Sequence, residues 1–241
     1  MRAICSDYEL LISAPMKILA LDTSLAAAAA CVYDAERGVM LSAETMPMER
    51  GHAEALLPLV DRIVEQGGGF AGLSRAASTI GPGSFTGIRV GIAAARAIAL
   101  ACGIPSVGVS TLAALAAPLL KAGETAAVLA AIDARHGQVY AQGFGPQGQS
   151  LFEATVCTPR QALELARARH VRLVGSGAAA LAIEAWTMGL NAEPVARPPM
   201  PDIAYVARLA AMADPAHAPA RPLYLKAASV TPQAAAAPPA G

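Results

Sequence analysis

The sequence has few charged and few aromatic residues, and its charges cancel. Of 241 residues, 15% are charged and 4% are aromatic, and 18 basic side chains balance 18 acidic ones. Strong binding to nucleic-acid phosphates needs a basic surplus, which this chain lacks. We therefore do not expect it to bind RNA tightly by itself. Its 55% of hydrophobic residues is enough to bury the core of one large or two small domains.

Patterns typical of metal sites and disulfide frameworks are also missing. The four cysteines and four histidines are scattered along the chain, without C-x-x-C spacing. Such dispersion predicts neither a zinc site nor a set of disulfides. These residues are Cys5, Cys31, Cys102, Cys157, His52, His136, His170 and His217.

No apolar run reaches the length of about twenty residues that a membrane span requires. Asp7 and Glu9 lie where a signal peptide would need its apolar core, so we expect a cytoplasmic protein without membrane contact. Met16-Lys17 stands directly before the first clear strand. Residues 1–15 are therefore either an N-terminal extension or the product of a start assigned too early.

The first half of the chain reads as strands followed by alternating helices and strands. An apolar run at 18–21 ends in Asp22, and 26–33 and 39–45 would complete a three-stranded meander. Alanines 26–30 could instead form a helix, but so short a helix would be marginal. The other elements expected here are a helix over 52–66, a strand over 75–80, a helix over 85–101, a strand over 107–109 and a helix from Ser110 to about Lys121.

The second half begins as the first does. The apolar run 128–132 ends in Asp133, and a polar turn leads to a strand over 139–144. Asp22 and Asp133 thus occupy equivalent places in two strand-turn-strand units, which predicts a duplication into two lobes. The remaining expectations are a strand near 154–156, a helix from Pro159, a strand over 171–174, a helix after Gly175-Ser176-Gly177, a proline-rich crossing over 194–201, a helix near Asp202, an extended piece over 222–225 and a disordered tail over 227–241.

A glycine-rich turn formed by Gly81, Pro82, Gly83 and Ser84 leads into the helix over 85–101. Backbone N–H groups at such a place can bind phosphate. The turn is no Walker sequence, because no G-K-[ST] follows. Its glycines could equally supply unusual backbone angles while Ser84 caps the helix, and this structural interpretation is favoured.

The helix itself carries small residues every four positions, at Gly87, Gly91, Ala95 and Ala99, with Ile98 beside them. Small residues at this spacing allow another helix to approach closely, either within the chain or from a second chain. The helix over 52–66 is the obvious neighbour.

Asp22 and Asp133 could hold Mg²⁺ through water in a nucleotide cleft between the lobes, with Thr23 beside the first acid. Gly175 and Gly177 could then lie near an adenosine. Alternatively, both acids only cap turns. Nucleophilic catalysis is not predicted, because Gly83 directly precedes Ser84 and no G-x-S-x-G elbow results.

Several segments, in this order, resemble the bacterial TsaB family, also called YeaZ. They are Met16 to Ser24, His52 with Leu56-Leu57-Pro58, Gly81 to Gly91, Gly108 to Leu112, Ala131 to Arg135 and Pro222 to Leu225. The resemblance implies an α/β, actin-like (ASKHA, ribonuclease H-like) fold of two duplicated lobes with mixed sheets. The lobes are expected at 16–115, completed by about 203–226, and at 116–202.

The resemblance also implies a role in forming N6-threonylcarbamoyladenosine (t6A) at position 37 of tRNA. In the family, TsaB pairs with the paralogous transferase TsaD, TsaE joins as an ATPase, and TsaC supplies the carbamoyl-adenylate. Contact with tRNA is expected only within that complex, and the isolated chain could form a homodimer. The resemblance favours a partner surface on the first two long helices, made by His52, Leu56, Leu59, Ile63, Gly87, Gly91, Ala95 and Ile98.

Two features indicate that this chain does not catalyse the transfer. TsaD-like chains carry an H-x-x-x-H metal motif in the helix after the strand at 107–109, and here the helix from Ser110 has no histidine. Actin-like ATPases have a glycine two residues after each cleft acid, where this chain has Ser24 and Arg135. We therefore expect no catalytic residue, no metal and at most vestigial nucleotide binding. The alternatives are an active ATPase or sugar-type kinase and, less favoured, a metallopeptidase.

Overall fold

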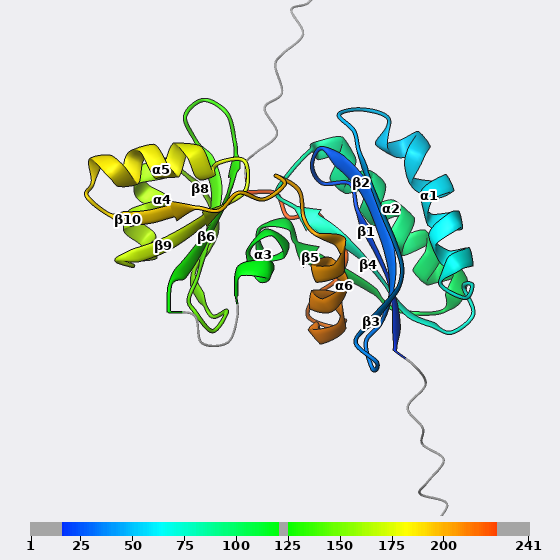
Figure 1. The fold of residues 1–241 in the computed structure, drawn as a ribbon. Coiled ribbons are helices and arrows are strands. Elements are labelled where there is room, and N and C mark those ends of the chain that lie inside the picture. Colours follow the sequence, from blue (N-terminus) through cyan, green and yellow to red (C-terminus); the bar gives the residue numbers. More distant parts are fainter. Residues whose placement is uncertain (1–15, 121–124, 226–241) are drawn as a thin grey trace, which may run out of the picture.

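The computed structural model describes residues 16–120 and 125–225. These residues form two lobes, each built on a five-stranded sheet with parallel and antiparallel pairs (Figure 1). The predicted extension at 1–15 and the tail predicted at 227–241 lie outside the described residues, so both stay predictions.

The first sheet has the strand order β3-β2-β1-β4-β5. β1 pairs antiparallel with β2 and parallel with β4. Every residue of β2 is buried, because helices cover both faces of the sheet, and this burial outweighs the helix preference of its alanines. The strand interpretation is thus confirmed. The strands are β1 Lys17–Asp22, β2 Ala27–Asp34, β3 Val39–Pro47, β4 Leu73–Gly81 and β5 Ser106–Ser110.

Helices pack on both faces of this sheet. α1 (His52–Gln66) and α2 (Phe85–Cys102) share one hydrophobic cluster with Leu19 and Leu21 of β1. Residues of α3 (Thr111–Ala116) and α6 (Ile203–Met212) share another with the alternate β1 residues Ile18 and Ala20. Figure 1 shows α1 and α2 on the side of the sheet that faces away from the second lobe.

The second sheet repeats the first. Its order is β10-β9-β6-β7-β8, which places β6 to β10 as β1 to β5 are placed. β6 again pairs antiparallel with the next strand and parallel with the fourth. This duplication gives the chain the actin-like (ASKHA) fold. The elements are β6 Ala127–Asp133, β7 Val139–Phe144, β8 Ser150–Cys157, α4 Pro159–Ala166, β9 His170–Val174, α5 Ala178–Thr187 and β10 Asn191–Pro194.

Two elements differ from the sequence predictions. The helix expected from Ser110 to Lys121 ends at Ala116 and continues only as a 3-10 turn, Ala117–Leu119. Pro118 explains this, because its ring clashes with the carbonyl four residues earlier in an α-helix. Strand β10 was not predicted, since it is short and leads directly into the prolines.

Candidate functional site

Asp22 ends β1 in a fully enclosed position. Its Oδ1 accepts hydrogen bonds from Ser24 N at 2.9 Å, Ser24 Oγ at 2.6 Å and Thr79 Oγ1 at 2.6 Å. The carboxyl is 1% exposed, and burial raises its pKa against the opposing effect of these hydrogen bonds. Oδ2 has no hydrogen-bond partner among the described residues. Asp22 therefore fastens β1 to β4 and does not line an open site.

The glycine-rich turn packs directly against the backbone after Asp22. Ser84 N donates to Ser24 O at 2.7 Å, and Thr23 Oγ1 donates to Gly87 O at 2.7 Å. A Cβ on Gly83 would overlap Ser24 O, and one on Gly87 would overlap Thr23 O. The space that a phosphate would need is filled by the chain itself. The geometry favours the structural interpretation of this turn.

Ser84 caps α2, as the sequence suggested. Its side-chain oxygen accepts a hydrogen bond from Gly87 N at 3.2 Å, which satisfies one of the free N–H groups of the first helical turn. Gly81 has a φ of 110°, a conformation that only glycine adopts easily. Pro82 is buried beside it. The turn therefore sets the position of α2 on the sheet.

The two glycines near the start of α5 have a similar role. Gly177 N donates to Ala131 O at 3.0 Å, and a Cβ on Gly175 would overlap the same carbonyl. They let the helix start sit on β6. Between them, Ser176 Oγ accepts a hydrogen bond from Asp133 N at 3.1 Å. Gly175 and Gly177 are thus packing residues, and Ser176 is the member of this motif that reaches the space between the lobes.

A cleft of about 490 Å³ lies between the lobes. Asp133 lines it, whereas Asp22, Thr23, Gly175 and Gly177 do not. Four of the five residues predicted to bind a nucleotide are therefore not at the cleft surface. Sequence reasoning missed Glu49 and Tyr140, which have no distinguishing pattern. The lining residues are Leu25, Glu49, Gly83, Ser84, Ile132, Asp133, Ala134, Arg135, Tyr140 and Ser176.

The turn after β6 is poorly suited to phosphate. Arg135 and His136 have φ angles of 61° and 56°, and Asp133 Oδ1 already accepts a hydrogen bond from Arg135 N at 2.8 Å. The cleft thus presents the carboxylates of Asp133 and Glu49 with a single arginine. Two carboxylates disfavour a phosphate group unless cations accompany it.

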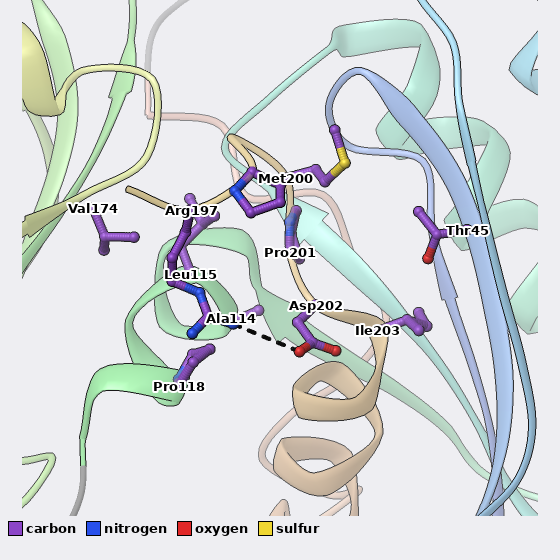
Figure 2. Close-up of a pocket in the computed structure, with 11 residues that line it drawn as sticks. Thr45, Ala114, Leu115, Pro118, Val174, Arg197, Met200, Pro201, Asp202 and Ile203 are labelled. Atoms are coloured by element: carbon purple, nitrogen blue, oxygen red, sulfur yellow. Dashed lines mark ion pairs between the residues drawn. The ribbon is translucent and has the colours of Figure 1, made fainter. Parts of the chain in front are cut away.

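A second, smaller cavity of about 270 Å³ lies beside the crossing from the second lobe to α6 (Figure 2). Its charged lining residues are Arg197 and Asp202, which pair with each other at 3.8 Å. Asp202 also caps α6 by accepting a hydrogen bond from Ala204 N at 3.0 Å. Both charges are already in use, so this cavity offers no free charge to an ionic ligand.

The donor set for the metal of TsaD-like chains does not fit this chain. The helix after β5 presents Thr111 and Leu115, both buried, and the described ranges contain no group of three His, Cys, Asp or Glu side chains close enough to share an ion. Thr111 Oγ1 has no hydrogen-bond partner in these ranges. A lone hydroxyl does not replace two imidazoles as a metal ligand.

Most of the residues predicted to form the partner surface are buried inside the chain, so the prediction is wrong for them. Leu56, Leu59 and Ile63 are at most 1% exposed, and they pack under α1. Gly87, Gly91 and Ala95 are buried under α2. A Cβ on Gly91 would lie 2.7 Å from both Ser78 Oγ and Thr23 Oγ1. The small-residue stripe therefore seats α2 on the sheet, because its spacing serves a helix on a sheet as well as a helix on a helix.

The other two predicted partner residues are also engaged within the chain. His52 Nε2 donates to Leu25 O at 3.0 Å. Ile98 is half-buried against the cluster under α1 and α2.

The opposite sides of α1 and α2 are open. Leu57 is 61% exposed and Leu100 is 85% exposed. We call this surface the outer face, and it consists of Ala53, Leu57, Ala93, Ala97 and Leu100, all exposed. A signal for it was present in the sequence, because Thr86, Arg89 and Arg96 are the only polar side chains among the 18 residues of α2. A helix apolar all around is typically covered on both sides.

Comparisons with known proteins agree with this fold. Residues 46–217 match the family model of TsaD, the tRNA N6-adenosine threonylcarbamoyltransferase. The chain is 39% identical to the tRNA threonylcarbamoyladenosine biosynthesis protein TsaB of Escherichia coli over 52% of this chain, and it spans about half, 53%, of that protein. It is 33% identical to the TsaB of Haemophilus influenzae over 68% of this chain and 74% of that protein.

A solved structure supports the same assignment. The YeaZ structure from Pseudomonas aeruginosa superposes with a TM-score of 0.68 at 25% identity, covering 87% of this chain and all, 100%, of that one. The sequence match over residues 46–217 and the superposition over 87% of this chain thus agree. The chain belongs to the TsaB (YeaZ) family.

Proposed function

We propose that this chain is a non-catalytic subunit for t6A formation at adenosine 37 of tRNA, and that it acts by pairing with a TsaD transferase through the outer face. TsaE and the TsaC synthase would join the same reaction, and tRNA would be met in the complex. The TsaB relatives named for t6A biosynthesis support the process.

The observation that carries the pairing is the surface of α2. The 18 residues of this helix have a mean hydropathy of 1.5, which is enough by length and composition alone to cross a membrane. Only 33% of them are buried, so much of this apolar helix is exposed. Its inner side already packs on the sheet. Contact of the exposed leucine and alanines on the outer side with water is unfavourable. Covering them with another protein surface would therefore be favourable.

The chemistry of the partner follows from the family relationship. Because the TsaD family model matches this chain, TsaD is expected to carry a helix pair equivalent to α1 and α2. Two such pairs can pack as a four-helix seam, with the small residues Ala93 and Ala97 allowing close approach. The same geometry would produce a homodimer when TsaD is absent.

The interior of the chain supports an accessory role. Asp22 is enclosed, the glycine-rich turn is filled by Ser24, and the helix after β5 offers no imidazole. We propose that any nucleotide in the cleft between the lobes binds weakly and is not hydrolysed by this chain alone.

Reconstitution tests the proposal. TsaD, TsaE and the carbamoyl-adenylate synthase should form t6A on an unmodified tRNA transcript when this chain is present and should lose most of that activity when it is omitted. Leu100→Glu, which places a charge at the most exposed leucine of the outer face, should abolish co-elution with TsaD and the activity together. Full activity without the chain would refute the accessory role, and an intact complex with Leu100→Glu would refute the seam.

A further inference from the structure

An arginine at the start of α2 is held by two aromatic rings on the protein surface. The guanidinium carbon of Arg89 lies 3.7 Å from the ring centre of Phe85 and 5.8 Å from that of Tyr224. Arg89 Nε donates to the Tyr224 hydroxyl at 3.0 Å. The two ring centres are 5.8 Å apart. Residues 135 positions apart in the chain thus meet around one exposed cation.

These contacts fix the arginine without using its terminal nitrogens. Stacking and the Nε hydrogen bond restrict a side chain that is otherwise among the most flexible. Within the described residues, Nη1 and Nη2 have no hydrogen-bond partner and no acidic group pairs with Arg89. A fixed guanidinium with free terminal nitrogens matches the two oxygens of a carboxylate.

The cluster adjoins the outer face. Phe85, Arg89, Ala93 and Ala97 follow one another at intervals of four on α2, and the last two belong to the outer face. Phe85 and Tyr224 are about half exposed. A partner seated on the outer face would therefore meet Arg89 at its edge.

Charge is unevenly divided between the two helices. α2 carries Arg89 and Arg96 and no acidic residue, whereas α1 exposes Glu54, Asp61 and Glu65. In a two-fold or pseudo-two-fold seam whose axis runs parallel to the helices, the α2 of one chain faces the α1 equivalent of the other. In a pair of copies of this chain, the basic α2 of one copy would thus lie opposite the acidic α1 of the other.

We propose that Arg89, held by Phe85 and Tyr224, anchors a carboxylate on the partner's helix equivalent to α1 and so fixes the register of the seam. This inference rests on the proposed function, since the anchor needs a partner on the outer face. The glycine-rich turn then has a second role, because the turn that positions α2 also places Phe85 against the guanidinium of Arg89.

The test is the affinity of the full chain for TsaD from the same organism, measured by calorimetry at low and high salt. Arg89→Gln should weaken binding about tenfold, as expected for losing a charge-assisted pair at an interface. Arg89→Lys should weaken it nearly as much, because an ammonium group cannot present the fork. Arg96→Gln is the matched control, with the same charge change on the same helix, and should change affinity less than about threefold.

The outcomes separate the anchor from the seam. Unchanged thermal unfolding of the isolated variants shows that the fold is intact. Equal affinities for Arg89→Gln and Arg96→Gln would overturn the anchor while Leu100→Glu still tests the seam. If Arg89→Gln spared TsaD binding and instead weakened tRNA binding by the complex, the arginine would bind RNA phosphate, and the proposal would also be overturned.

Discussion

Adjacent leucines on α1 provide a test of which side of the helix is core and which is interface. Leu56 is 1% exposed and Leu57 is 61% exposed. Replacing either with alanine removes the same atoms from neighbouring positions of one helix. The two variants are therefore matched in chemistry and helix propensity, and they differ only in the direction of the side chain.

The expected magnitudes follow from burial. Leu56→Ala opens a cavity under α1, and buried leucines replaced by alanine lower the free energy of unfolding by about 2–5 kcal/mol. Leu57→Ala should change that free energy by less than about 0.5 kcal/mol, as exposed substitutions do. Full burial of a leucine is worth about 1.5–3 kcal/mol. Covering the 61% that is exposed would thus add about 1–2 kcal/mol to partner binding, or roughly fivefold to twentyfold in affinity.

Urea unfolding of the isolated chain measures the first quantity, and calorimetry with TsaD measures the second. Unfolding should be repeated at several protein concentrations, because a homodimer would make the midpoint depend on concentration. The reasoning fails if Leu57→Ala destabilises the fold as much as Leu56→Ala does. It fails equally if Leu57→Ala binds TsaD with unchanged affinity.

Three further outcomes follow from the structure. Arg75→Met should lower the free energy of unfolding by about 2 kcal/mol, because Arg75 Nη1 donates to carbonyls at the C-terminal end of α6, those of Ala210, Ala211 and the capping residue Ala213, at 2.8, 3.1 and 2.7 Å. Urea unfolding measures this change, and an unchanged midpoint contradicts it. Burial raises the pKa of Asp22, so its protonated form favours folding at low pH, and that contribution is lost as pH rises through the folded-state pKa. Asp22→Asn, which does not ionise, should therefore gain stability relative to the unmodified chain as pH rises from the acidic range through the folded-state pKa, and a constant difference would exclude the linkage. Isothermal calorimetry with Mg-ATP should detect no tight binding and no turnover by the isolated chain, and both together would favour the ATPase alternative.

The sequence was sufficient for the order of the elements other than β10, because the relevant signals are local. Apolar runs ending in polar turns indicated the strands, and glycine and proline marked where helices end. The equivalence of Asp22 and Asp133 predicted the duplication that the strand orders show. Pro118 was also a local signal, but the prediction of a helix from Ser110 to about Lys121 did not take it into account.

The site was harder to predict from the sequence than the order of the elements, because the site depends on contacts between distant segments. Asp22 and Asp133 end equivalent strands, yet Thr79 and Ser24 enclose the first while the second is exposed in the cleft. Gly91 has the same spacing whether its neighbour is a helix of another chain or Ser78 of the sheet. The meeting of Arg89 with Tyr224 spans most of the chain, and no periodicity encodes it.

The glycines beneath α2 have a consequence for the shape of the outer face. α1 contacts the sheet mainly through leucine, isoleucine and valine side chains, whereas half of the buried stripe of α2 is made of the small residues Gly87, Gly91 and Ala95, beside Ile88 and Ile92. Since the distance between packed elements depends on the side chains at the contact, we expect α2 to sit lower on the sheet than α1. The surface offered to a partner is then a step, high along one helix and low along the other. Two such steps are complementary when one is rotated by half a turn relative to the other. Gly87, Gly91 and Ala95 would therefore favour a partner whose two helices differ in height in the same way.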